Sequence, residues 1–142
     1  MRTILVAIDG SDSALRALDY AMKQAGLAPK AKLHVLTVRP PANTYTAWEV
    51  YVTAERIQEI AIARARDVLE AATARLKDCG CEFEVEQLEG ETAETITRRA
   101  DELHCESIAM GTHGHGTFGI LFMGSVAQRV VHHANVPVTM VK

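Results

Sequence analysis

Apolar and polar positions follow two different patterns along this chain. Four short segments, residues 3–8, 32–38, 107–110 and 136–141, are mostly apolar, as expected of strands buried on both faces of a sheet. A fifth segment, residues 82–88, alternates polar and apolar residues with a period of two. This alternation predicts a strand that has one exposed face and lies near a sheet edge.

The segments between these runs carry apolar residues at every third or fourth position, which predicts amphipathic helices. Either Ser11 or Ser13 is expected to cap the first helix, Gly26 to end it, and Thr92 to cap the third. The residues expected on the buried faces are Ala14, Leu18, Met22 and Ala25 in the first helix, Ile57, Ala61, Ala65, Val68, Ala72 and Leu76 in the second, and Ala93, Ile96, Ala100 and Leu103 in the third. The fourth helix is expected over residues 126–134.

Strands that are separated by helices run parallel and cross over with a right hand. The chain is therefore predicted to form one α/β domain over residues 1–142. Its core is a single doubly wound five-stranded parallel sheet with helices on both faces, in a Rossmann-like arrangement. Ligands of such sheets bind beyond the carboxyl ends of the strands, where the strand order reverses. If the first and fourth strands are neighbours, Asp9 and the loop that begins at Gly111 meet at one crevice.

The composition narrows the function. A net charge of -3 and a pI of about 6.1 give no support for nucleic acid or an anionic membrane as the main partner. No apolar run approaches the roughly 20 residues of a membrane span. The first strand reaches the charge of Asp9 too early for a secretion signal, so a cytoplasmic location is expected. Cys79, Cys81 and Cys105 are predicted to be structural thiols in a reducing compartment, because no second metal-ligand pair follows at zinc spacing.

Five of the nine glycines lie between positions 111 and 124, where the fourth strand turns into the last helix. Without Cβ atoms, backbone N–H groups in such a loop can converge on one point. The helix that begins near Ser125 adds its own N–H groups and the positive end of its dipole. Residues 107–142 contain no Asp or Glu, but they hold Arg129, Lys142 and four histidines. These features together predict a phosphate-binding site.

Two standard phosphate-binding motifs do not fit this loop. Residues 119–125 lack the lysine of a P-loop, and no G-x-G-x-x-G follows the first strand. The spacing that is present is G-x2-G-x9-G-S, formed by Gly111, Gly114, Gly124 and Ser125. With its flanks, this spacing resembles the ATP-binding branch of the universal stress protein family. The matching stretches are Asp9-Gly-Ser, Gly90-Glu-Thr-Ala, Gly111-Thr-His-Gly-His-Gly, Gly124-Ser-Val-Ala-Gln-Arg-Val and His133-Ala-Asn-Val-Pro-Val.

The resemblance implies that the chain binds ATP, or AMP or ADP, together with Mg²⁺. Asp9 is then expected beside the nucleoside, where it helps to hold the metal ion, and the backbone of Val38 is expected to meet the adenine. His115 stands where the family often has arginine, and histidine is charged only part of the time near neutral pH. The expected binding residues are Ala7, Asp9, Val38, Met110, Gly111, His113, Gly114, His115, Gly124, Ser125 and Val126.

Simpler interpretations stay open for several of these residues. Ser125 and Gln128 have the spacing of a capping box, so Ser125 can serve only to cap its helix. Asp9 can serve only as a turn-forming residue before Gly10. His113 and His115 can be solvent-exposed loop residues, since two histidines alone do not make a metal site.

The favoured function is a nucleotide-responsive regulatory protein of the stress response, with at most slow ATP hydrolysis and an unidentified protein partner. The resemblance also implies a homodimer, formed through the edge strand that runs from Val136 to Val141. One alternative is an enzyme in which His113 and His115 act as in the [HT]-x-G-H signature of nucleotidyltransferases. That signature follows the first strand in those enzymes, whereas here it follows the fourth. The other alternative is a dimeric interaction module that binds no nucleotide.

Overall fold

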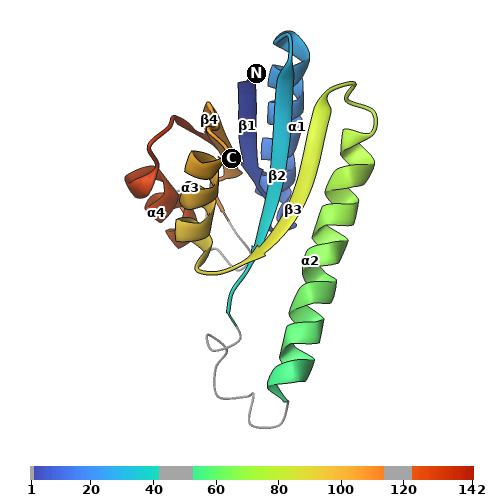
Figure 1. Cartoon of the computed structure of the whole chain (residues 1–142), viewed down its shortest axis with the longest axis vertical. Coiled ribbons are helices and arrows are strands. Elements are labelled where there is room, and N and C mark those ends of the chain that lie inside the picture. Colours follow the sequence, from blue (N-terminus) through green and yellow to red (C-terminus); the bar gives the residue numbers. More distant parts are fainter. Residues whose placement is uncertain (1, 42–52, 114–122) are drawn as a thin grey trace.

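The computed structural model describes residues 2–41, 53–113 and 123–142, and strands and helices alternate along the chain (Figure 1). The alternation predicted from the apolar periodicity is confirmed, with one helix between each pair of consecutive strands. The elements are β1 (Arg2–Ala7), α1 (Asp12–Leu27), β2 (Ala31–Arg39), α2 (Ala54–Leu76), β3 (Glu82–Glu89), α3 (Thr92–Glu102), β4 (Ser107–Gly111), α4 (Ser125–His133) and β5 (Val138–Val141).

All five strands run parallel in one sheet of order β3-β2-β1-β4-β5, which confirms the predicted doubly wound fold. Ala7 at the end of β1 is paired with Leu36 of β2 on one side and with Met110 of β4 on the other. The strand order reverses between β1 and β4, so their carboxyl ends form the switch point at which ligands bind in such sheets. Strand β3 lies at an edge, as its period-two pattern predicts.

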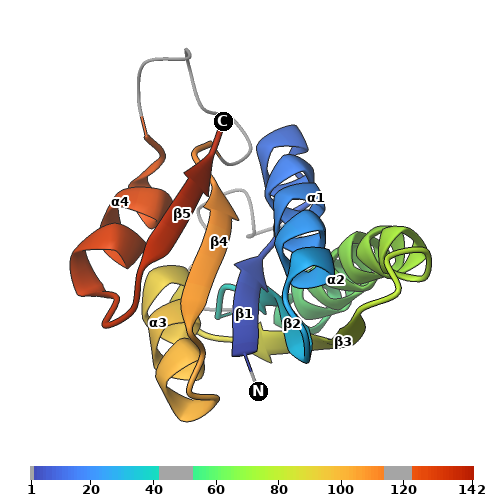
Figure 2. The same ribbon diagram turned by 90° about the horizontal axis from the view of Figure 1, so that it is seen from above.

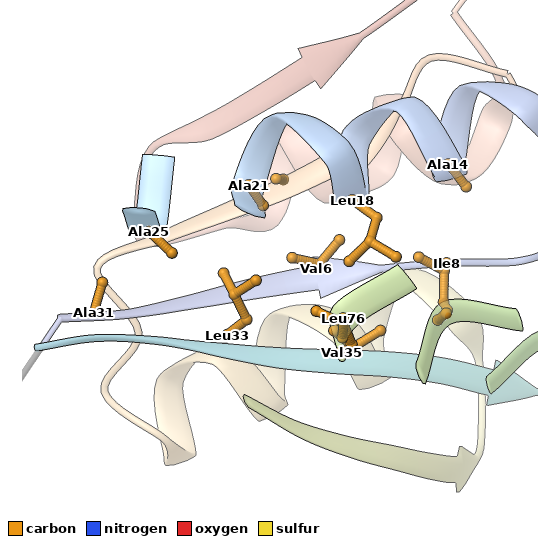
Figure 3. Packing of buried hydrophobic residues seen from close by; sticks show 12 residues of the cluster. Val6, Ile8, Ala14, Leu18, Ala21, Ala25, Ala31, Leu33, Val35 and Leu76 are labelled. Carbon is orange, nitrogen blue, oxygen red and sulfur yellow. The ribbon is translucent and has the colours of Figure 1, made fainter. Parts of the chain in front are cut away.

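Helices α1 and α2 cover one face of the sheet, and α3 and α4 cover the other (Figure 2). Successive residues of a strand point to opposite faces. Val6 therefore packs under α1 with Leu18 and Leu33 (Figure 3), whereas Leu5 packs on the other face with Ile108. All five of these side chains are fully buried. Near-continuous apolar runs are required because both faces of these strands are covered.

One predicted helix cap is confirmed, and two helix ends differ from the sequence predictions. Ser11, one of the two predicted caps, is the N-cap of α1, and its hydroxyl accepts the N–H of Ala14. Helix α1 continues past Gly26 to Leu27. Helix α3 is capped by Glu91 instead of Thr92, because the Glu91 carboxylate accepts two N–H groups of the first turn and its charge suits the helix dipole. Within the residues described, no helix has both the length and the apolarity needed to cross a membrane.

Two of the three cysteines depart from the prediction of structural thiols. Cys79 and Cys81 form a disulfide in the turn between α2 and β3, with Cα atoms 5.3 Å apart. Gly80 between them has a φ of 65°, a left-handed conformation that glycine adopts without steric cost. Cys105 is a buried free thiol, as predicted, and burial raises its pKa to about 11.

A charged network joins the edge strand β3 to its neighbours. The carboxylate of Glu86 accepts hydrogen bonds from His34 Nε2 at 2.6 Å and from Arg99 Nε at 2.8 Å. Partial burial would raise the pKa of Glu86, but the hydrogen bonds from Arg99 and His34 outweigh it and hold the pKa below its ordinary value of 4.5. His34 is only 3% exposed, so this carboxylate satisfies a polar group that water barely reaches.

We predict that Glu86→Gln lowers the free energy of unfolding near neutral pH by about 1–3 kcal/mol, because Arg99 and His34 lose a charged acceptor. Urea denaturation measures this difference. The pKa of Glu86 is lowered in the folded state, so its contribution is present above the unfolded-state pKa and is lost as the pH falls through the folded-state pKa.

The difference between wild type and Glu86→Gln should therefore shrink in acid. Glu84→Gln is the matched control, because Glu84 lies on the same strand with a side chain that is 57% exposed and should matter less. Equal losses for both variants would contradict the assignment.

Candidate functional site

A cavity of about 520 Å³ lies at the carboxyl ends of β1, β2 and β4, at the switch point of the sheet. Its size falls in the range of small-molecule sites. Of the eleven predicted binding residues, the nine that line this cavity are Ala7, Asp9, Val38, Met110, Gly111, His113, Gly124, Ser125 and Val126. The other two, Gly114 and His115, lie outside the described residues. The structure thus brings together the residues after β1, β2 and β4, as the predicted topology requires.

Asp9 begins the turn from β1 into α1. Its Oδ1 accepts the N–H of Ser11 at 2.9 Å, and Gly10 between them has a φ of 84°. This is the turn-forming role open to Asp9 from the sequence. The side chain is exposed and also lines the cavity, so turn formation and contact with a ligand are compatible.

Gly111 lies at the closest approach between β4 and α1. A Cβ built on this residue would lie 2.3 Å from Ser13 Oγ and 2.7 Å from the backbone nitrogen of Ala14. Just beyond it, the carbonyl of His113 accepts hydrogen bonds from Ser11 Oγ at 3.2 Å and Ser13 Oγ at 2.6 Å. The missing side chain of Gly111 lets α1 begin directly against β4, and the two serines hold the start of the glycine loop.

His113 lines the cavity and contains a buried polar atom. Its Nδ1 lies 2.6 Å from the hydroxyl of Thr112, and its Nε2 is buried without a hydrogen-bond partner among the described residues. A hydroxyl that donates to Nδ1 leaves the ring proton on Nε2. A buried polar atom of this kind carries a desolvation cost that a ligand acceptor would relieve.

Among the described residues, no side chain caps the N-terminus of α4. The N-cap residue is Gly124, and Ser125 is the first helical residue, so the capping-box interpretation of Ser125 is wrong. Gln128, the other member of that box, donates to the carbonyl of Met123 at 2.7 Å instead. Helices α1, α2 and α3 each have a side chain that accepts N–H groups of their first turn. The first-turn N–H groups of α4 receive no such acceptor among the described residues, although this end of the helix lines the cavity.

The positive charge of Arg129, which lies on α4, is paired with a carboxylate. Arg129 of α4 donates to the carboxylate of Glu91, the N-cap of α3, at 2.6 Å. This ion pair ties α3 to α4, whose first residues form one wall of the cavity. The attraction that the cavity offers an anion therefore comes from N–H groups and the helix dipole more than from an unpaired arginine.

The lining of the cavity contains both apolar and polar residues. Leu36, Val38, Met110 and Ile96 contribute apolar side chains, and Asp9, His113 and Ser125 contribute polar ones. Leu36 and Ile96 were not among the predicted residues. Leu36 is two positions before Val38 on β2 and so shares its face, a signal that the strand period already contains.

Within the described ranges, no group of three or more His, Cys, Asp or Glu side chains could hold a metal ion by itself. Among the described residues that line the cavity, Asp9 is the one carboxylate. A metal ion bound here would need ligands from a bound molecule as well.

In doubly wound α/β domains, a crevice at the switch point is the usual place for a ligand. A family model described as the Universal stress protein family matches residues 1–142. The chain therefore belongs to the universal stress protein family. A relative from Thermus aquaticus, named universal stress protein in QAH/OAS sulfhydrylase 3'region, is 34% identical over 99% of this chain and 98% of its own length.

Solved structures support the same fold. The hypothetical protein MJ0577 has a TM-score of 0.84 at 24% identity, over 99% of this chain and 95% of its own, which supports the fold alone. A universal stress protein from Archaeoglobus fulgidus, solved in complex with dAMP, has a TM-score of 0.75 at 27% identity, over 100% and 98% of the two chains. A universal stress protein solved in complex with cAMP has a TM-score of 0.75 at 26% identity, over 99% and 97%.

We predict that Gly111→Ala destabilises the protein by about 1–3 kcal/mol, because the new methyl group would press on the backbone of α1 and something must shift. Gly26→Ala is the matched control. Gly26 lies inside α1 with nothing within 4 Å of a built Cβ, so alanine should be neutral or stabilise by up to about 1 kcal/mol. Thermal and urea unfolding measure both, and equal effects would contradict the close approach of β4 and α1.

Proposed function

We propose that this chain is a nucleotide-responsive regulatory protein that binds an adenine nucleotide in the cavity at the switch point. The ligand is ATP, or AMP or ADP, and Mg²⁺ accompanies it. The observation that carries the proposal is a cavity of suitable size whose wall contains His113 and a helix N-terminus with no side-chain cap among the described residues. An anionic oxygen is a suitable acceptor for the N–H groups at this helix end.

The mixed apolar and polar lining of the cavity suits the two parts of a nucleotide. The apolar surface of Leu36, Val38 and Ile96 favours a flat base, and the main chain of Val38 is the proposed partner of the adenine edge. Gly124, Ser125 and the N–H groups of the first turn of α4 are proposed to bind phosphate, and we propose the same for Gly114 and His115. Mg²⁺ bound to Asp9 and to the phosphates would neutralise part of their charge.

Relatives with the same fold bind the same class of ligand. The complexes of family members with dAMP and with cAMP share adenine and at least one phosphate group. Both structures cover nearly the whole of this chain. The shared chemistry favours an adenine nucleotide over other ligands of the cavity.

The proposed role is regulatory more than catalytic. The glycine loop lacks a P-loop lysine, so we propose at most slow hydrolysis of ATP. We further propose a cytoplasmic homodimer that pairs through the edge strand from Val136 to Val141 and offers a nucleotide-dependent surface to a protein partner. A ligand changes such a surface only if it binds one conformation more tightly than another.

We predict that His113→Ala weakens the binding of AMP and ATP by about 5- to 150-fold, which corresponds to the loss of one hydrogen bond of about 1–3 kcal/mol. Isothermal titration calorimetry with and without Mg²⁺ measures the Kd. The control is His132→Ala, since His132 is exposed near the other end of α4. Unchanged affinity in His113→Ala would remove the main support for the proposal.

We also predict that Gly124→Val, like Gly114→Val, abolishes nucleotide binding in a protein that stays folded. Gly124 has a φ of −59°, which valine can adopt, so the effect would come from the side chain at the cavity wall and not from backbone strain. Circular dichroism checks the fold, and extraction of the purified protein with acid detects any nucleotide that copurifies. Wild-type affinity in both variants would show that the phosphates bind elsewhere.

Incubation with radiolabelled ATP distinguishes binding from turnover, and rapid turnover that His115→Ala abolishes would support an enzyme.

A further inference from the structure

The disulfide between Cys79 and Cys81 lies at the end of the molecule opposite the cavity. It occupies the turn that joins α2 to β3, whereas the cavity lies at the carboxyl ends of the strands (Figure 1). The disulfide lies beside the start of β2, where Lys32 pairs with Glu82, whereas Leu36 and Val38 near the end of β2 line the cavity. Its chemistry can therefore be studied without altering a residue of the cavity.

This disulfide is poorly suited to a stabilising role. A cross-link stabilises a fold by restricting the unfolded chain, and the gain grows with the length of the closed loop. Here only Gly80 lies between the two cysteines. The bond joins the end of α2 to the start of β3, and these are already adjacent in the chain. A bond that contributes so little to stability can open and close without unfolding the protein.

Cys79 and Cys81 also differ from Cys105 in their accessibility to solvent. Cys79 and Cys81 are partly exposed, whereas Cys105 is 4% exposed. Burial raises the pKa of the Cys105 thiol to about 11, which disfavours the thiolate needed for exchange. The chain thus contains a reachable cysteine pair and an unreactive cysteine that serves as an internal control.

The local hydrogen bonds distinguish the two sulfur atoms of the pair. The backbone N–H of Cys81 donates to Cys79 Sγ at 3.1 Å. An N–H donor stabilises negative charge on sulfur, so Cys79 is the better leaving group when the disulfide is attacked. The C-terminal end of α2 lies nearby and disfavours a thiolate, which limits the size of this effect.

We propose that Cys79 and Cys81 form a reversible dithiol–disulfide site that exchanges with low-molecular-weight thiols of the glutathione class. In reduction, a glutathione thiolate attacks Cys81 Sγ, the bond between the two protein sulfurs breaks, and Cys79 leaves as a thiolate that takes up a proton. A second glutathione thiolate then attacks the mixed disulfide and releases glutathione disulfide. The protein gains two electrons and two protons, and two glutathione molecules are oxidised. Oxidation runs these steps in reverse: the Cys81 thiolate attacks glutathione disulfide and releases one glutathione thiolate, and the Cys79 thiolate then attacks Cys81 Sγ and releases the second.

The test is a redox titration of the purified protein in buffers with graded ratios of reduced to oxidised glutathione. Each sample is quenched by alkylation, and intact-mass spectrometry counts the modified thiols. We expect one transition in which two thiols, Cys79 and Cys81, appear together. Cys105 should be alkylated only after denaturation, and Cys105→Ser should leave the transition unchanged. A disulfide that stays closed at every ratio, or a dithiol that never closes, overturns the proposal.

Single variants test the predicted difference in reactivity between the two thiols. With oxidised glutathione, Cys81→Ser should form one glutathione adduct on Cys79, and Cys79→Ser should form the adduct on Cys81 more slowly. A hydrogen bond that raises the thiolate fraction tenfold speeds attack only about threefold, because nucleophilicity falls with basicity, so a difference of about threefold is expected. Circular dichroism verifies that both variants are folded. Equal rates would overturn the role of the Cys81 N–H, and adducts only on Cys105 would overturn the site itself.

Discussion

The parallel pairing of β1 with β4 is the contact on which the rest of the structure depends. The sheet extends from this pair in two directions, with β2 beside β1 and β5 beside β4. The helix after β1 therefore lies on one face of the sheet and the helix after β4 on the other, and a crevice opens between the two connections. Gly111 makes the pairing compatible with α1, because a side chain there would collide with Ser13 and Ala14. The hydroxyls of Ser11 and Ser13 then fix the carbonyl of His113. One missing Cβ thus couples the packing of a helix to the position of the glycine loop.

The same crevice shows how a protein with net charge -3 can offer a favourable place for an anion. Glu91 and Arg129 neutralise each other, and no side chain of the described residues accepts the N–H groups of the first turn of α4. Dipoles of the main chain are fixed by the fold and need no reorganisation when a ligand arrives. Such a site attracts phosphate oxygens without a cluster of lysines that would also attract nucleic acid.

The sequence predicts the order and type of the elements that the described residues form, because strands buried on both faces need apolar runs that helices do not. It also identifies nine of the residues that line the cavity, since the topology brings the ends of β1 and β4 together, but it misses Leu36 and Ile96. The sequence does not predict the caps of α3 and α4 or the disulfide correctly, because these depend on one backbone angle or on the position of one side chain. Gly124 instead of Ser125 is the N-cap of α4, Glu91 instead of Thr92 caps α3, and the left-handed Gly80 lets Cys79 meet Cys81. No periodic pattern contains that information.

The two edges of the sheet are chemically unlike. Strand β3 carries four glutamates, at positions 82, 84, 86 and 89, whereas β5 is the uncharged stretch Val138–Val141. A second copy of β3 laid alongside the first would place carboxylates within one strand spacing of each other, and such like-charge pairs are unfavourable. Growth by strand addition is therefore open at one edge only. A sheet that can be extended on a single side is complete once two copies pair, so pairing of this kind would not continue into fibres.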